Sequence, residues 1–270
     1  MTRLSRLLAL LVCGLATAAV SLAQIPNNYV TQQESLPCLN KRFSLRVHTT
    51  LSPTGPVPFD TTAFEAMVES ANAAFGPACI SFEVCEYLET ENYRYHSHEN
   101  TDDQERENIY GSPNRIDVYI PNIDSSGRCG DATQAGITMP LTGYVMVVNE
   151  CISASSSTLT HELGHFFGLY NTYETQFGDE LVNGDNCATA GDLVCDTPAD
   201  PYIENSPIVW TSPDDPCLFV WPGVDALGLY YVPHTANAMS LYEGSCSCGF
   251  TRGQLERVVE TYRSAPDGFW

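Results

Sequence analysis

The chain has 270 residues and a formal net charge of −21, with 33 acidic side chains against 12 basic ones. Nucleic acids and anionic membrane surfaces are recognised by clustered cations, so this composition argues against both as partners. The length allows one large domain or two closely packed subdomains.

The N-terminus has the pattern of a secretory signal peptide. Two arginines precede an apolar run from Leu7 to Val20, and small residues at 21–23 offer cleavage positions. We therefore predict a signal peptide over residues 1–23 and a secreted chain, extracellular or periplasmic. Residues 24–40 would be an N-terminal extension or a short pro-segment. The alternative is an uncleaved anchor, but the apolar run is short for a membrane-spanning helix.

Three regular elements are predicted after residue 40. Residues 42–50 alternate and become β-branched toward their end, which predicts a strand. Residues 60–75 begin with capping residues and predict an amphipathic helix, which Gly76 and Pro77 end. Residues 79–89 predict a second strand. The apolar face of the helix consists of Phe64, Met67, Val68, Ala71 and Phe75.

The following elements are shorter. Residues 91–114 are polar and predict an exposed excursion that carries two histidines. Residues 115–123 alternate apolar and polar side chains and predict a strand. Residues 129–140 read as a glycine-containing loop. Residues 144–148 predict a short apolar strand, which we interpret as an edge strand able to pair with an extended peptide.

The second half of the chain begins with a helix. Serines at 153–157 offer N-caps for a helix that starts near Thr158. From Asn171 to Trp221 the chain is rich in Asp, Gly, Pro and Cys, which suits a segment held by cross-links and ions. Residues 253–263 predict a last amphipathic helix, with Leu255, Val258, Val259 and Tyr262 on one side.

This order of elements indicates two unequal subdomains in one catalytic unit at residues 41–270. Regular strands and helices come first, and irregular chain follows. We place the upper subdomain at about 41–168 and the lower subdomain at about 169–270.

Ten cysteines remain after Cys13 leaves with the signal peptide. An even set in an exported chain argues for disulfides, although the spacing does not give their pairing. If all ten pair, no thiolate is left to bind a metal ion. They are Cys38, Cys79, Cys85, Cys129, Cys151, Cys187, Cys195, Cys217, Cys246 and Cys248.

The segment THELGHFFGLYNTYE, residues 160–174, contains two histidines four residues apart with a glutamate between them. On a helix, His161 and His165 lie on one face, about one turn apart, and neutral imidazole nitrogens bind zinc readily. Glu162 would take a proton from the attacking water and return it to the leaving amine. The alternative is a chance HExxH on a surface helix.

Gly168 and Asn171 continue the motif. Three residues after His165, Gly168 can end the helix in a left-handed conformation that a Cβ would resist. The chain then doubles back, which places Asn171 to approach the metal from a third side.

At this point a family resemblance becomes specific. HELGHFFGLYN resembles the metzincin signature HExxHxxGxxH, and NAMS at residues 237–240 resembles the Met-turn, whose methionine would be Met239. Within the metzincins the chain is similar to the pappalysin or cytophagalysin family from about Arg42 to Arg263. The segments CATAGDLVCDTPAD, CGFTRGQLERV and ANAAFGPACISFEV carry the rest of the similarity.

The resemblance implies a zinc endopeptidase with an α+β, metzincin-type fold. A twisted mixed sheet would carry a backing helix and an active-site helix above the cleft, and an irregular, disulfide-rich lower subdomain would end in a C-terminal helix. The resemblance also implies calcium near GDLVCDTPAD, with Asp192, Asp196 and the Thr197 carbonyl as oxygen ligands. The alternative for these aspartates is a solvated acidic loop.

The sequence departs from the family pattern at two positions. Asn171 stands where the family has its third histidine ligand, and Leu241 stands where the family usually has the Met-turn tyrosine, with Tyr242 one residue further. An amide oxygen is a poorer zinc donor than imidazole nitrogen, so we expect Asn171 to be a weak or absent ligand. His234 is an alternative outside ligand by sequence.

Two functions follow. The first is a secreted zinc endopeptidase, a monomer that acts on protein or peptide substrates with Glu162 as general base. The second is a weakened or inactive homologue that serves as a peptide-binding module, which the changes at Asn171 and Leu241 favour and the retained Glu162 opposes. A disulfide-stabilised structural protein would leave the Met-turn unexplained.

Overall fold

The computed structural model describes residues 36–55, 57–99, 103–111, 114–133, 143–201, 211–242 and 244–265. The predicted signal peptide, and most of the predicted N-terminal extension, lie outside these residues. Within the described part of the chain, no helix has the length and apolar character needed to cross a membrane.

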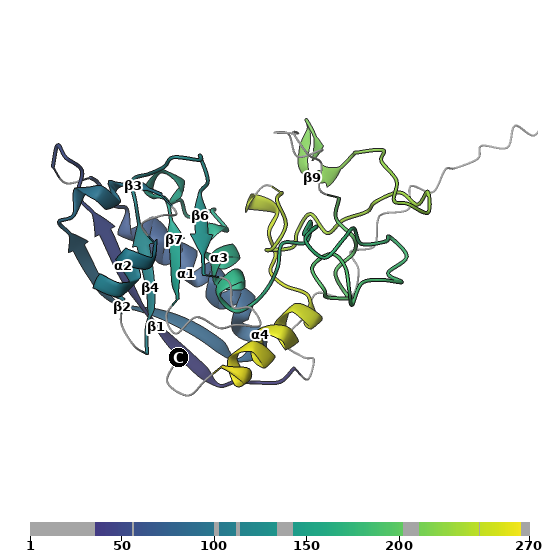
Figure 1. The fold of residues 1–270 in the computed structure, drawn as a ribbon, viewed down its shortest axis with the longest axis horizontal. Coiled ribbons are helices and arrows are strands. Elements are labelled where there is room, and N and C mark those ends of the chain that lie inside the picture. Colours follow the sequence, from purple (N-terminus) through teal and green to yellow (C-terminus); the bar gives the residue numbers. More distant parts are fainter. Residues whose placement is uncertain are drawn as a thin grey trace, which may run out of the picture.

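A twisted five-stranded mixed sheet forms the centre of an α+β fold (Figure 1). Its order is β2-β1-β4-β7-β6, in which β6 is an antiparallel edge strand and the other neighbours run parallel. The strands are β1 Lys41–Thr50, β2 Ile80–Thr90, β4 Ile116–Ile120, β6 Gly130–Ala132 and β7 Tyr144–Val147. Two small ribbons pair β3 Ser97–His98 with β5 Ile123–Asp124, and β8 Thr211–Ser212 with β9 Asp215–Phe219.

The edge of the sheet differs from the sequence prediction. The predicted loop at residues 129–140 contains β6, and β6 pairs with β7 from Gly130↔Val147 to Ala132↔Val145. The prediction that residues 144–148 form an edge strand is therefore wrong, because β4 and β6 flank β7 on both sides. Three residues of sequence Gly-Asp-Ala have little β-propensity of their own, so the pairing with β7 decides their conformation.

Helices cover both faces of the sheet (Figure 1). Helices α1 Thr61–Phe75 and α3 Thr158–Phe166 pack on one face, where the predicted apolar face of α1 is buried. Asp60 caps α1 by accepting a hydrogen bond from the Ala63 N–H at 3.0 Å. Helix α2 Asp103–Tyr110 lies over the other face. These contacts confirm the predicted strand at 42–50 and the predicted helix at 60–75.

The expectation of an exposed excursion at residues 91–114 is met only in part. Tyr93 and Ile109 are more than half exposed, but His98 is 1% exposed and Arg106 is 2% exposed. The Arg106 guanidinium lies over the rings of Tyr119 and Tyr144, 4.6 and 5.1 Å from their centroids. Aromatic faces attract a desolvated cation, so single polar side chains of this segment are buried.

The chain after α3 is largely irregular and lies beside the sheet (Figure 1). It leads to the last helix, α4 Arg252–Ser264, whose side chains Leu255, Val258 and Val259 are buried as predicted. Four disulfides pair Cys38–Cys79, Cys129–Cys151, Cys187–Cys195 and Cys217–Cys246. Cys85 and Cys248 are exposed and free, so not all of the ten cysteines outside the predicted signal peptide form disulfides.

Candidate active site

Helix α3 carries the HExxH motif and is packed from both sides. Leu159 and Leu163 belong to the hydrophobic core beneath the sheet. On the other side, Gly164 lies against Met239: a Cβ on Gly164 would contact the Met239 sulfur and lie 3.3 Å from its Cε. The backbone N–H of Thr172 donates to the Met239 carbonyl at 3.0 Å. The structure therefore places the predicted Met-turn directly beneath the motif helix.

The two motif histidines face each other with defined tautomers. Their rings have centroids 4.8 Å apart and planes at 82°. The Nδ1–H of His161 donates to the Ala238 carbonyl at 2.8 Å, and the Nδ1–H of His165 donates to the Leu169 carbonyl at 2.9 Å. With Nδ1 protonated in each neutral ring, each Nε2 presents a lone pair.

The helix ends as the glycine predicts. Gly168 has φ +86°, and its N–H donates to the His165 carbonyl, while the Leu169 N–H donates to the Gly164 carbonyl. Both bonds belong to a left-handed helix end that turns the chain back. Asn171 is brought within hydrogen-bonding reach of His161 and His165.

Three acceptor atoms converge at this point. The Asn171 Oδ1 is buried and has no hydrogen-bond partner among the described residues. Burial, followed by the charge of His165, lowers the pKa of His161 to about 3, and burial lowers the pKa of His165. Neutral imidazole lone pairs and an orphaned amide oxygen fit a cation, and this donor set suits zinc.

The described residues provide no further metal ligand at this place. Within them, no group of three or more His, Cys, Asp or Glu side chains is arranged to hold a metal ion. His234, the alternative ligand by sequence, is therefore not brought to the two motif histidines. Its surroundings include the charge of Asp196.

Glu162 lies next to the edge of the sheet and is 6% exposed. Burial, and then the negative charge of Asp131, raises the pKa of its carboxyl well above the ordinary value. The side chain packs against Gly130 of β6. Gly130 was not predicted from the sequence as a site residue, because the predicted loop at residues 129–140 had no predicted contact with the HExxH motif.

The residues after the Met-turn are arranged differently from the family pattern. Leu241 is 57% exposed. The Tyr242 hydroxyl donates to Asp200 Oδ1 at 2.9 Å, and the Thr172 hydroxyl donates to Asp200 Oδ2 at 2.6 Å. Burial raises the pKa of Asp200 to about 6. Tyr242 is thus engaged in a bond that ties the Met-turn to the segment after Asn171.

The predicted calcium residues fall into two groups. Both carboxylate oxygens of Asp192 accept from the Thr197 hydroxyl at 2.9 Å, and Asp192 is 1% exposed. The Asp196 carboxylate accepts from the Thr251 hydroxyl and the Gly253 N–H at the start of α4. Its charge also contributes to the raised pKa of Asp192.

Glu180 is a further buried carboxylate whose surroundings include the charge of Asp192. It is 7% exposed, and its buried Oε2 has no hydrogen-bond partner among the described residues. Burial, and then the charge of Asp192, raises the pKa of Glu180 to about 8, and burial raises the pKa of Asp192 to about 7. Glu180 was missed from sequence because it lies in irregular chain, where no periodicity marks a buried side chain.

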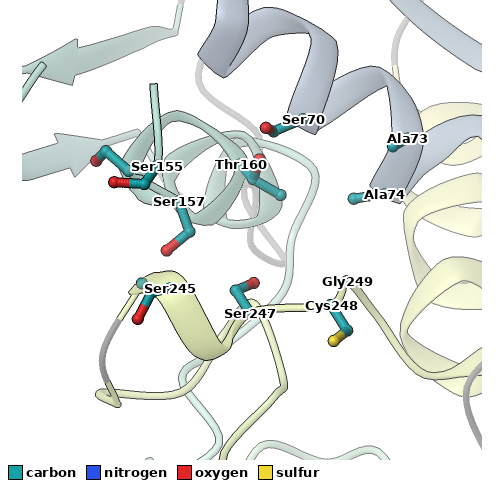
Figure 2. Close-up of a pocket in the computed structure, with 12 residues that line it drawn as sticks. Ser70, Ala73, Ala74, Ser155, Ser157, Thr160, Ser245, Ser247, Cys248 and Gly249 are labelled. Carbon is teal, nitrogen blue, oxygen red and sulfur yellow. The ribbon is translucent and has the colours of Figure 1, made fainter. Parts of the chain in front are cut away.

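A hydroxyl-lined pocket of ≈ 330 Å³ lies at the start of α3 (Figure 2). Serines from α1, from the segment before α3 and from the segment before Gly249 surround it, together with Thr160 and the free Cys248. None of the predicted site residues lines this pocket.

Comparison with known proteins gives consistent family matches. The family model described as Peptidase_M43: Pregnancy-associated plasma protein-A matches residues 100–263. An extracellular metalloprotease of Arthroderma otae is 27% identical over 226 residues, which cover 80% of this chain and 75% of that protein. One of Arthroderma benhamiae is 26% identical over 226 residues, covering 80% and 74%.

Solved structures were also compared. Myroilysin has a TM-score of 0.35 and 11% identity, covering 90% of this chain and 98% of that one. Metalloproteinase-II from Bacteroides fragilis has a TM-score of 0.35 and 12% identity, covering 53% and 47%.

Proposed function

Because this chain belongs to the pregnancy-associated plasma protein-A family of metallopeptidases, we propose that it is a secreted zinc endopeptidase. The observation that carries the proposal is the convergence of His161, His165 and Asn171 beside the buried Glu162. Three acceptor atoms fit a cation between them, and a carboxylate beside that cation would be placed to accept and return a proton.

The residues that would hold zinc are His161 and His165 through Nε2, and Asn171 through Oδ1. When bound, zinc supplies Lewis-acid polarisation of a peptide carbonyl and lowers the pKa of a water molecule to about 7. The carbonyls of Ala238 and Leu169 fix the two rings in orientation through their Nδ1–H groups.

Glu162 would act as the general base and then as the general acid. Its carboxylate accepts the proton of the attacking water and delivers it to the leaving amine. Glu162 lies against one face of β6, and among the described strands β6 pairs only with β7. An extended peptide could therefore add to the other edge of β6 by backbone hydrogen bonds, close to Glu162. This role replaces the one that the sequence suggested for residues 144–148.

Secretion and the division of the chain belong to the same proposal. A signal peptide over residues 1–23 would direct export, and residues 41–270 would form the catalytic unit, with its two subdomains meeting at Gly168. The four disulfides and the extracellular naming of the fungal relatives support export.

A calcium ion would bind at Glu180 and Asp192. Two buried carboxylates with raised pKa values, one with an orphaned oxygen, fit a hard divalent cation. The main-chain carbonyl of Asp192 is occupied by the Arg257 guanidinium at 2.6 Å, so the carboxylates are the groups left for the ion. Asp196 would serve α4 rather than calcium.

The second candidate function is a peptide-binding homologue with weak or no hydrolysis. The observations that favour it are the amide ligand at Asn171 and the engagement of Tyr242 with Asp200, which leaves the exposed Leu241 at the family's tyrosine position.

One variant tests the enzyme directly. Glu162→Ala should lower hydrolysis of an unfolded protein substrate by about 10²- to 10⁴-fold, because the proton transfer is lost, while bound zinc per chain stays unchanged. The control is Glu69→Ala, which alters an exposed glutamate on α1. Equal hydrolysis by the wild type and Glu162→Ala would refute the proposal. Stoichiometric zinc without hydrolysis in the wild type, with hydrolysis in Asn171→His, would support the peptide-binding function.

A further inference from the structure

Gly130, at the start of β6, is the point where the sheet edge meets the Glu162 side chain. A Cβ on Gly130 would lie 2.7 Å from Glu162 Cγ and 2.8 Å from Cδ, and closer still to Oε1. Real Cβ atoms essentially never lie closer than 3.0 Å to a non-bonded heavy atom. No residue with a Cβ therefore fits at position 130 while Glu162 keeps its place.

Backbone conformation does not explain this glycine. Gly130 is absent from the residues with positive φ, and it pairs with Val147 in a regular antiparallel ladder. Glycine inside a strand weakens the strand, and it often marks a close approach of another group. Here the three atoms nearest to the Cβ position all belong to Glu162.

The backbones of β6 at Gly130 and of α3 at Glu162 are each fixed by other contacts. On the β6 side, the Asp131 carboxylate lies 3.4 Å from the Arg128 guanidinium and 3.6 Å from His98 Nε2. The neighbouring Cys129 is joined to Cys151 by a disulfide. On the α3 side, the helix is packed between the core and the Met-turn. An added methyl group would therefore displace the Glu162 side chain rather than either backbone.

We propose that Gly130 is a positioning residue for the reaction: its missing Cβ creates the space that holds the Glu162 carboxylate beside the candidate metal centre. This inference rests on the proposed role of Glu162 as general base. A misplacement of about 1 Å at a reacting group can lower the rate by about 100-fold, so a methyl group at this contact has a measurable effect.

The first test is Gly130→Ala. We expect kcat to fall by about 100-fold while KM changes by less than about threefold, with unchanged zinc content and an unchanged thermal unfolding midpoint. The control is Gly76→Ala, because Gly76 has ordinary φ and no atom within 4 Å of its Cβ position. A Gly130→Ala protein with wild-type kcat would overturn the proposal.

The second test is rescue by a shorter acid. Glu162→Asp removes one methylene, so it should cost at least about tenfold less activity in the Gly130→Ala background than in the wild type. If Gly130→Ala folds poorly, the same double variant should restore the unfolding midpoint. The two residues do not share this space if the activity losses of the two single variants simply multiply in the double variant. The same conclusion follows if the double variant does not restore the unfolding midpoint.

A crystal structure of Gly130→Ala separates this inference from the proposed function. The Glu162 carboxylate should be displaced from its wild-type position, and an unmoved carboxylate contradicts the inference whatever the activity. If Glu162→Ala retains full hydrolysis, the role of Glu162 as base fails, and Gly130 loses its role in the reaction even where the carboxylate moves.

Discussion

At the scale of single residues, we propose that Asn171 limits the metal affinity of the candidate metal centre. Asn171 stands at the sequence position of the third histidine in the metzincin signature. Its amide oxygen is buried, and the two motif rings beside it expose lone pairs. An amide oxygen bears no charge and is a weaker zinc donor than imidazole, so this single side chain limits affinity without removing the site.

We therefore predict that Asn171→His binds zinc more tightly by on the order of 100-fold, about 2.7 kcal/mol. Competition with a chelator of known affinity measures this change. Asn183→His, which alters an exposed asparagine in the same half of the chain, serves as the control. Equal affinities of the wild type and Asn171→His would mean that residue 171 does not contact the ion.

At the scale of elements, α2 is held to the sheet by a buried set of charges. Asp117 accepts hydrogen bonds from Arg46 Nε at 2.7 Å and from His48 Nε2 at 2.8 Å. Glu107 of α2 is 6% exposed, and burial, followed by the charge of Asp117, raises its pKa to about 7. The nearby charges of Arg106 and Arg46 offset only part of this cost.

This raised pKa predicts a pH-dependent stability. Because the folded-state pKa of Glu107 lies above its ordinary value of 4.5, the folded protein binds more protons between these pH values. The contribution of Glu107 is complete below about pH 4.5 and is lost as pH rises through about 7. Glu107→Gln should reduce the fall in unfolding free energy between pH 5 and pH 8 by on the order of 2 kcal/mol, measured with urea.

The matched control for this prediction is Glu105→Gln on the same helix. Glu105 is exposed and pairs with Arg94 at the surface, so its replacement tests the same substitution on the same helix without burial. If Glu105→Gln and Glu107→Gln lose stability alike as pH rises, burial of Glu107 is not the cause.

At the scale of the whole molecule, the core and the irregular chain are stabilised by different forces. A large apolar core lies between the β-strands and α1, α3 and α4. The irregular chain between Gly168 and α4 has short strands and exposed apolar side chains, and disulfides such as Cys187–Cys195 and Cys217–Cys246 cross-link it. In this irregular chain the buried carboxylates of Glu180 and Asp192 lower the stability of the fold unless a cation neutralises them.

Removal of calcium should therefore destabilise the protein. At calcium concentrations about 100 times the dissociation constant, the ion adds about 2.7 kcal/mol, and a chelator such as EGTA should remove this gain. Thermal unfolding with and without calcium measures it. Glu180→Gln should abolish the calcium response, whereas Asp179→Asn, an exposed neighbour, should retain it. A response that persists in Glu180→Gln places the ion elsewhere.

Much of the fold could be predicted where a segment carries its own pattern. The apolar face of α1, the strand at 42–50 and the last helix follow from side-chain periodicity, which is a local property of the chain. Helix α2 was not predicted because its sequence is polar and its buried Arg106 lies over Tyr119 and Tyr144 on distant strands. These partners lie outside the local sequence around α2, so a local pattern cannot predict the contact.

The candidate site divides in the same way. By itself, the sequence determined that His161, Glu162 and His165 share a helix and that Gly168 ends it, because helical spacing and glycine conformation are local. The resemblance to the metzincin family added Met239 as the methionine of a Met-turn. Only the tertiary structure decided that β6 is the last of the described strands in the sheet, with Gly130 against Glu162, and that a buried Glu180 is affected by the charge of Asp192. These outcomes depend on steric fit and charge between segments that are far apart in the chain, and such contacts exist only after the segments have packed together.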